Sequence, residues 1–222
     1  MSLSGPRDDF RPWAVVPAKR FGRAKSRLGG ALASDERREL ARALCNRVLC
    51  ACADSGALHG TLLATDGADA AALAVQRRAA VLRDRPGESS LARIVDAALT
   101  ELRARGATHA LVVMADLPCA RARDLRELLA VLRNADVVLV PDAQRRGTNA
   151  LGLRLDLPFL TAFGRADSLQ AHLREAARCG ARARVLHQPR LALDIDTPGD
   201  LSALRSAPAG AWPPPARCAP AR

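Results

Sequence analysis

Carboxylates follow two short apolar runs of the sequence, at positions where chemistry could use them. Asp116 comes directly after the run 110–114, and Asp194 and Asp196 come after the run 191–193. In an extended Asp-x-Asp segment alternate side chains point to the same side, so both carboxylates can face one cation. Oxygen ligands of this kind suit Mg2+, which is usually shared between carboxylates and substrate phosphates. The simpler alternative is that these aspartates only cap the helices that follow them.

The two lysines of the chain, Lys19 and Lys25, stand in one loop, residues 18–30, which follows the first apolar run. Every other basic side chain of this loop is an arginine. An ammonium group is a compact point charge that suits phosphate binding, although two residues could also share a loop by coincidence. Together with the carboxylates, such a loop fits metal-assisted transfer of a nucleotidyl group, in which the lysines offset charge on the leaving pyrophosphate.

Short apolar runs alternate with amphipathic segments along most of the chain. This rhythm predicts an α/β fold, with a mostly parallel sheet covered by helices on both faces. We expect one domain over 13–204, a loose arm over 1–12 and a disordered tail rich in proline and alanine over 205–222. The predicted strands lie at 13–17, 61–65, 80–82, 110–114, 137–140 and 149–155, with further extended pieces at 185–187 and 191–195. One predicted helix begins at residue 34. The others cover 68–78, 90–105, 121–133, 168–179 and 198–204.

The composition excludes several classes of protein. The 222 residues are 49% apolar and 26% charged, and no apolar run is long enough to cross a bilayer. Without a secretory signal, we expect the protein in the cytoplasm. The net charge of +11 suggests a polyanion as partner, but the arginines are scattered and aromatic residues make up only 3%. Nucleic-acid binding is therefore disfavoured, because few side chains could stack on bases.

The common nucleotide and hydrolase fingerprints are missing. No GxGxxG motif follows the first predicted strand, and no GxSxG elbow occurs. The stretch 22–26 resembles a P-loop superficially, but it lacks the glycine immediately before the lysine. Since ligands of open parallel sheets bind beyond the carboxyl ends of the strands, the loop 18–30 and the three aspartates mark the expected site.

Eight short segments carry a resemblance to a known family. They occur, over about residues 13–204, in the order seen in the 2-phospho-L-lactate guanylyltransferase family. The segments are PAK at 17–19, AKSRL at 24–28, SDER at 34–37, ADLP at 115–118, PD at 141–142, GTNAL at 147–151, the stretch 159–172 and DIDTP at 194–198.

This resemblance implies a single nucleotidyltransferase domain similar to those of nucleotide-diphospho-sugar transferases. It implies transfer of GMP from GTP to a small phosphorylated acid, with release of pyrophosphate, on the route to coenzyme F-420. The acids used in the family are 2-phospholactate, phosphoenolpyruvate and 3-phosphoglycerate. The protein would act as a monomer or homodimer.

The resemblance also implies roles for individual residues. Magnesium would be held by Asp116, Asp194 and Asp196. The catalytic groups would be Lys19, Lys25, Arg27 and Asp116, and the phosphorylated acid would be gripped by Thr148, Gly164 and Ser168, partly through free N–H groups at a helix start. The nucleotide would contact Pro17, Lys19, Lys25, Thr65, Asp66, Pro86 and Gly87.

The sequence leaves the acceptor open. The chain has one residue more between Gly164 and Ser168 than the family pattern, with Arg165 as the added residue. A nucleotidyltransferase that uses a sugar 1-phosphate or a molybdenum-cofactor-type acceptor would share the fold and the metal. The alternative outside enzymes is a basic protein that binds nucleic acid.

Overall fold

Seven strands form one mixed sheet in the part of the chain that the structure describes, which is residues 9–83 and 90–206 of a computed structural model. The strand order is β3-β2-β1-β4-β6-β5-β7. All neighbours are parallel except β6, which is antiparallel to both β4 and β5. The strands are β1 Pro12–Pro17, β2 Gly60–Thr65, β3 Ala80–Arg83, β4 His109–Val113, β5 Val137–Pro141, β6 Thr148–Arg154 and β7 Ala183–Val185.

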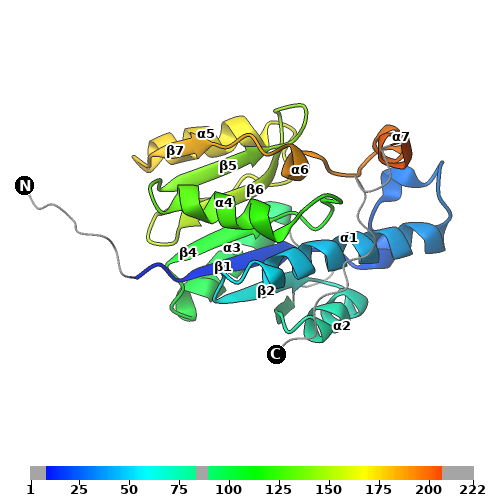
Figure 1. The fold of residues 1–222 in the computed structure, drawn as a ribbon, viewed down its shortest axis with the longest axis horizontal. Coiled ribbons are helices and arrows are strands. Elements are labelled where there is room, and N and C mark those ends of the chain that lie inside the picture. The colour runs from blue at the N-terminus through cyan, green and yellow to red at the C-terminus, as the bar shows by residue number, and fades with distance from the viewer. Residues whose placement is uncertain (1–8, 84–89, 207–222) are drawn as a thin grey trace, which may run out of the picture.

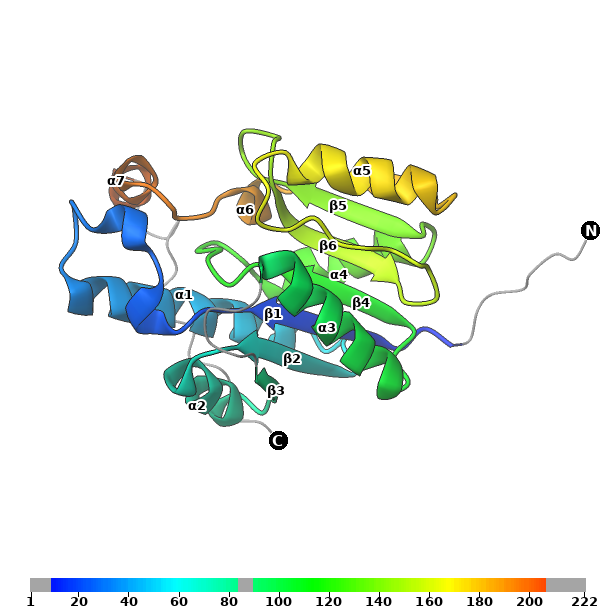
Figure 2. The same ribbon diagram turned by 180° about the vertical axis from the view of Figure 1, so that it is seen from behind.

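Helices cover both faces of this sheet, as the sequence predicts. One face carries α1 (Ser34–Asp54), α2 (Ala68–Gln76) and α4 (Ala122–Leu132), and the other carries α3 (Leu91–Ala104) and α5 (Ser168–Arg178). Figure 1 is viewed from the side of α1 and α4, and Figure 2 from the side of α3 and α5. Short helical pieces complete the chain: η1 (Phe21–Arg23), η2 (Ser26–Leu28), α6 (Pro189–Ala192) and α7 (Pro198–Ser206).

The strands divide their side chains between two cores. In β1, Ala14 and Val16 pack with the cluster under α1, α2 and α4, whereas Val15 packs with the cluster under α3 and α5. All three side chains are fully buried. A central strand with helices on both faces has no solvent side, which explains why β1, and β4 after His109, are apolar rather than alternating.

One predicted extended piece is wrong and another is displaced. The segment 191–195 does not form a strand, because the backbone N–H groups of Leu191 and Ala192 donate to the carbonyl of Gln188 and close the turn of α6. Pro189 starts this turn, where its missing N–H costs nothing. Strand β7 ends at Val185, where the predicted piece began.

Reversal of β6 brings its first residues to the edge where the parallel strands end. Thr148 and Asn149 open β6, and the carbonyl of Asn149 accepts from the N–H of Met114, just beyond β4. The carboxyl end of β4 and the start of β6 therefore share one edge of the sheet. Among the helices of residues 9–83 and 90–206, none is both long and apolar enough to cross a membrane.

Candidate active site

Three carboxylates meet at this edge of the sheet. Asp116, Asp194 and Asp196 each present an oxygen, and these oxygens all lie within 4.8 Å of one another. Asp116 lies in the loop after β4, and the other two lie between α6 and α7. The prediction that these residues converge is confirmed, and the donor set is one that a hard divalent cation prefers.

The three carboxylates repel one another, so the cluster favours a bound positive charge. Burial, followed by the charges of Asp116 and Asp196, raises the pKa of Asp194 to about 6. A hydrogen bond from Asn149 and the ammonium of Lys25 act in the opposite direction. A cation among the three oxygens would remove the repulsion, so the residues fit a divalent metal ion.

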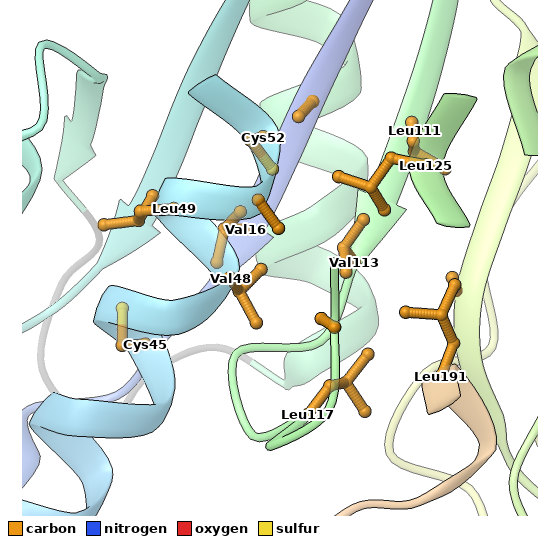
Figure 3. Packing of buried hydrophobic residues seen from close by; sticks show 14 of the residues in the cluster. Val16, Cys45, Val48, Leu49, Cys52, Leu111, Val113, Leu117, Leu125 and Leu191 are labelled. Carbon is orange, nitrogen blue, oxygen red and sulfur yellow. The ribbon is translucent and has the colours of Figure 1, made fainter. Parts of the chain in front are cut away.

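Core packing fixes the turn that carries Asp116. The next side chain, Leu117, is fully buried in the same cluster as Val113 and Leu191, and Figure 3 shows all three. Asp116 is not the cap of the following helix, because Asp124 accepts the hydrogen bond from the N–H of Arg121 at 3.0 Å. The carboxylate of Asp116 is therefore not used for capping.

The side chain of Asn149 holds the segment that carries Asp194. Its amide nitrogen lies 3.0 Å from the carbonyl oxygen of Leu191, 3.1 Å from that of Ala192 and 3.3 Å from Oδ1 of Asp194. These three hydrogen bonds connect the start of β6 to the end of α6. They orient Asp194 towards Asp116, on the neighbouring strand end.

Asp200, rather than the two aspartates of the cluster, caps α7. Its Oδ2 accepts from the backbone N–H of Asp196 at 3.0 Å and from that of Thr197 at 2.7 Å. Between the aspartates of the cluster, Ile195 is fully buried against Leu28 and other residues of a small third core. Because Ile195 points into this core, the side chains of Asp194 and Asp196 on either side of it point away from the core and towards Asp116.

A partly buried ion pair anchors α6 to the start of α4. The guanidinium of Arg190 bonds both carboxylate oxygens of Asp124, with Nε at 2.9 and 3.0 Å and Nη2 also in contact. Asp124 is fully buried, whereas the side chain of Arg190 is 31% exposed, so the carboxylate end of this bidentate pair is shielded from solvent. It keeps α6 in place immediately before the carboxylate cluster.

Lys25 inserts its ammonium between two carboxylates of the cluster. Its Nζ lies 2.7 Å from Oδ2 of Asp116 and 2.9 Å from Oδ1 of Asp196, and the side chain is only 8% exposed. Burial disfavours the charged ammonium, but the two carboxylates outweigh it and raise the pKa of Lys25. The backbone of Lys25 is left-handed, with φ of 57°, a conformation that costs a non-glycine residue about 1 kcal/mol or more.

The other predicted cations of the loop are more exposed. Nη1 of Arg27 lies 3.6 Å from Oδ2 of Asp196, and its side chain is 77% exposed. Lys19 is exposed, and no ion pair joins it to any other residue within the described ranges. The structure therefore brings Lys25 and Arg27 to the carboxylates, whereas the ammonium of Lys19 faces solvent.

Residues at the end of β2 brace the lysine loop. The carboxylate of Asp66 accepts from the backbone N–H of Arg20 at 2.7 Å, and the buried hydroxyl of Thr65 accepts from the N–H of Gly67 at 3.0 Å. A Cβ at Gly67 would come within 2.6 Å of the Cα of Arg20, so only glycine allows this approach. Pro17, the last residue of β1, is buried just before the loop.

The residues predicted to contact the nucleotide therefore differ in what the structure shows of them. Thr65 and Asp66 hold the loop in place, and their contact with a base stays a prediction. Pro86 and Gly87 lie outside the described residues.

Two of the predicted acid contacts lie around a buried histidine. Oγ1 of Thr148 lies 3.0 Å from Nδ1 of His172, and the backbone N–H of Ala162 donates to Nε2 of the same ring at 2.8 Å. Gly164, two residues after Ala162, has φ of 87°, which favours glycine. Its position near Leu91 places this loop against the start of α3.

The start of α5 offers less to an anion than the sequence suggests. Ser168 is its first residue and is nearly buried, but its N–H donates to the carbonyl of Arg165, and the N–H of Leu169 donates to Arg146. These N–H groups were expected to be free, so that part of the prediction is wrong. The added Arg165 forms an exposed ion pair with Asp167, and the extra length is taken up at the surface.

The sequence points to no role for Asn149 or Asp200, and for His172 it leaves a contact with the phosphate beside the simpler interpretation of a structural helix residue. Asn149 stands within the GTNAL segment, and its position directly after a predicted acid contact is the only signal for it. Asp200 bonds to residues close to it in the sequence. The pattern of a threonine followed three residues later by an acidic residue could therefore have predicted that it caps a helix. Nothing in the spacing connects His172 to Thr148.

Comparison with known proteins agrees with this geometry. The family described as "Guanylyl transferase CofC like" matches residues 13–206. The chain is 40% identical over 190 residues to a phosphoenolpyruvate guanylyltransferase of Chloroflexus aggregans, covering 82% of this chain and 91% of that protein. It is 37% identical over 183 residues to a 2-phospho-L-lactate guanylyltransferase of Halorubrum lacusprofundi, covering 82% and 79%.

A solved structure supports the same fold. A candidate nucleotide-diphospho-sugar transferase from Desulfovibrio desulfuricans superimposes with a TM-score of 0.70 at 18% identity, covering 88% of this chain and 86% of that one. The expected nucleotidyltransferase fold is therefore confirmed. With the family match over most of its length, the chain belongs to the CofC-like guanylyl transferases.

Proposed function

We propose that the protein transfers GMP from GTP to a small phosphorylated acid and releases pyrophosphate, in the biosynthesis of coenzyme F-420. The observation that carries this proposal is the convergence of Asp116, Asp194 and Asp196 with the ammonium of Lys25, at the edge where the parallel strands end. Such an edge is where open α/β sheets bind nucleotides.

The three aspartates would hold Mg2+. When bound there, Mg2+ would polarise the phosphates and neutralise charge that develops during transfer. Lys25 and Arg27 border the cluster and would bind the triphosphate, with Lys19 closing on it from the exposed part of the same loop. Pro17, Thr65 and Asp66 shape this nucleotide side, together with the segment of Pro86 and Gly87.

Thr148, Gly164 and Ser168 would bind the phosphorylated acid. An oxygen of its phosphate attacks the α-phosphorus of GTP, a new P–O bond forms, and the bond to the β-phosphate bridge breaks as pyrophosphate leaves. The attacking phosphate is largely ionised near neutral pH, so no protein group has to remove a proton from it. The task of the protein is to position the reactants and to offset their charge.

The acceptor is one of three acids: 2-phospholactate, phosphoenolpyruvate or 3-phosphoglycerate. Guanylyltransferases named for the first two of these are among the relatives of this chain. We expect the enzyme to work in the cytoplasm as a monomer or homodimer.

A direct assay tests this function. The purified protein is incubated with GTP and Mg2+ and with each acid separately, and both pyrophosphate and the mass of the product are measured. We expect pyrophosphate release that depends on one of the acids, with a product heavier than that acid by the GMP moiety. Release with a sugar 1-phosphate alone, or no release with any acid from a folded protein, would refute the proposal.

A further inference from the structure

A buried imidazole links the parts of the chain that carry the predicted acid contacts. His172 lies in the middle of α5 and is fully buried. Its Nδ1 meets Oγ1 of Thr148 at the start of β6, and its Nε2 meets the N–H of Ala162, two residues before Gly164. Ser168 lies one helical turn before it on α5. One side chain therefore contacts or adjoins all three acid-binding elements.

The hydrogen bonds define which ring nitrogen carries the proton. A backbone amide can only donate, so Nε2 of His172 must accept and carries no hydrogen. The single proton of a neutral imidazole is then on Nδ1, which donates to Oγ1 of Thr148. Burial also lowers the pKa of His172 to about 4, against the field of Glu175, which keeps the ring neutral.

This assignment leaves the hydroxyl of Thr148 with a proton to donate. Its oxygen already accepts from Nδ1, and within the described ranges no protein acceptor is found for its O–H. A hydroxyl held in this way suits an anionic oxygen, since hydrogen bonds to charged acceptors are the stronger ones.

Two aromatic rings keep the imidazole in place. Phe159 stacks on it with a centroid distance of 6.0 Å, and Phe163 packs against it in a T-shaped arrangement with a centroid distance of 4.8 Å. The same loop is tied to α3, because the N–H of Thr161 donates to Asp96 at 3.0 Å. The ring therefore has little freedom to exchange its two partners.

We propose that His172 is a positioning residue for the acceptor: its Nδ1–H turns the Thr148 hydroxyl into a donor aimed at an anionic oxygen of the phosphorylated acid, while its Nε2 fixes the loop of Gly164. This inference rests on the proposed function, in which Thr148 contacts the acid. It assigns His172 to acid recognition and gives it no part in binding GTP.

Two substitutions separate the two ring nitrogens. In His172→Gln, the side-chain carbonyl can replace Nε2 as the acceptor for Ala162, but the donor to Thr148 is lost. In His172→Asn, the amide can replace the Nδ1–H donor. We expect His172→Gln to raise KM for the acid about tenfold or more, as for loss of a hydrogen bond to a charged group, with KM for GTP within about twofold. His172→Asn should recover much of the acid affinity.

Variants of Thr148 complete a double-mutant cycle with His172. Thr148→Val should raise KM for the acid as His172→Gln does, Thr148→Ser should not, and the double variant Thr148→Val with His172→Gln should be no worse than Thr148→Val alone. The exposed His59, at the opposite end of the strands, gives the control His59→Gln, which should change neither KM. An unchanged acid KM in His172→Gln, equal rises for acid and GTP, or independent effects in the double variant would overturn the inference.

The wild-type protein provides a test that does not depend on folding of the variants. Nitrogen-15 NMR of the histidine side chains should find His172 neutral at pH 7 with its proton on Nδ1. A proton on Nε2, or a charged ring, would contradict the assignment. Failure of the proposed function would instead appear as a wild-type protein that releases no pyrophosphate with any acid.

Discussion

Nζ of Lys25 lies 2.7 Å from Oδ2 of Asp116, so the loop after β1 and the loop after β4 are joined by a largely buried ion pair across 91 positions of sequence. Asp196 adds a second contact to the same ammonium from the segment before α7. Three segments that are distant in the sequence thus meet in one charged cluster. Its net acidity, with three carboxylates around one ammonium, leaves room for a divalent cation.

Replacing Asp116 tests the metal site directly. Asp116→Asn keeps the shape of the side chain but removes one of three charges, so we expect pyrophosphate release to fall by about two orders of magnitude or more. The affinity for Mn2+, measured by electron paramagnetic resonance, should fall in parallel. Asp54→Asn, at the exposed end of α1, is the matched control and should behave as wild type. Near-normal turnover in folded Asp116→Asn would remove this residue from the mechanism.

Replacing Lys25 separates stability from catalysis. In Lys25→Met the carboxylates lose their ammonium, so without metal the free energy of unfolding should fall by about 2 kcal/mol, the scale of a hydrogen bond to a charged group. Added Mg2+ should recover part of this loss, since a cation that binds only the folded state stabilises it. GTP-dependent turnover should stay low even with metal.

Thermal unfolding with and without Mg2+ measures the effect of Lys25→Met. Lys19→Met serves as the comparison for stability, because that side chain is exposed and should contribute little. If Mg2+ stabilises Lys25→Met no more than wild type, the ammonium and the cation do not share the carboxylates.

The sequence was sufficient to predict the elements that are apolar throughout, and the residues that end them. The runs 13–17 and 110–114, which include most of β1 and β4, have no polar position, so they indicate buried strands, and Asp116 comes shortly after the second run. The alternation Asp194-Ile195-Asp196 also predicted that two carboxylates share a side. These inferences hold because each depends on only a few consecutive residues.

Other features depend on partners that spacing does not reveal. The apolar run 191–193 fits a strand or a helical turn equally well, and the hydrogen bonds from Leu191 and Ala192 to Gln188 decide for α6. The roles of Asn149 and His172 follow from the antiparallel course of β6, which places the start of that strand beside Asp116 and under α5. No local pattern specifies the direction of a strand that is inserted between two parallel ones.

Replacing Asn149 tests whether it positions Asp194. Asn149→Ala removes three hydrogen bonds and frees the end of α6, so we expect the affinity for Mn2+ to fall about 10- to 100-fold, as for other groups that orient metal ligands. KM for the acid should change less than the metal affinity. The exposed Asn134, in the turn after α4, provides the control Asn134→Ala. Unchanged Mn2+ affinity in Asn149→Ala would show that Asp194 is held without this amide.

The neutral His172 predicts a dependence of stability on pH. Its pKa in the folded protein is about 4, below the ordinary value of 6.5, so between these values the unfolded chain binds a proton that the folded chain does not. Stability from this residue is therefore complete above pH 6.5 and falls as the pH drops towards 4, by about 1.4 kcal/mol per pH unit. Other groups titrate in the same range, among them Asp194 with the opposite sign. The measurement is thus the difference in unfolding free energy between wild type and His172→Gln, which should shrink across this window; a constant difference would mean that the folded protein protonates His172 as readily as the unfolded chain.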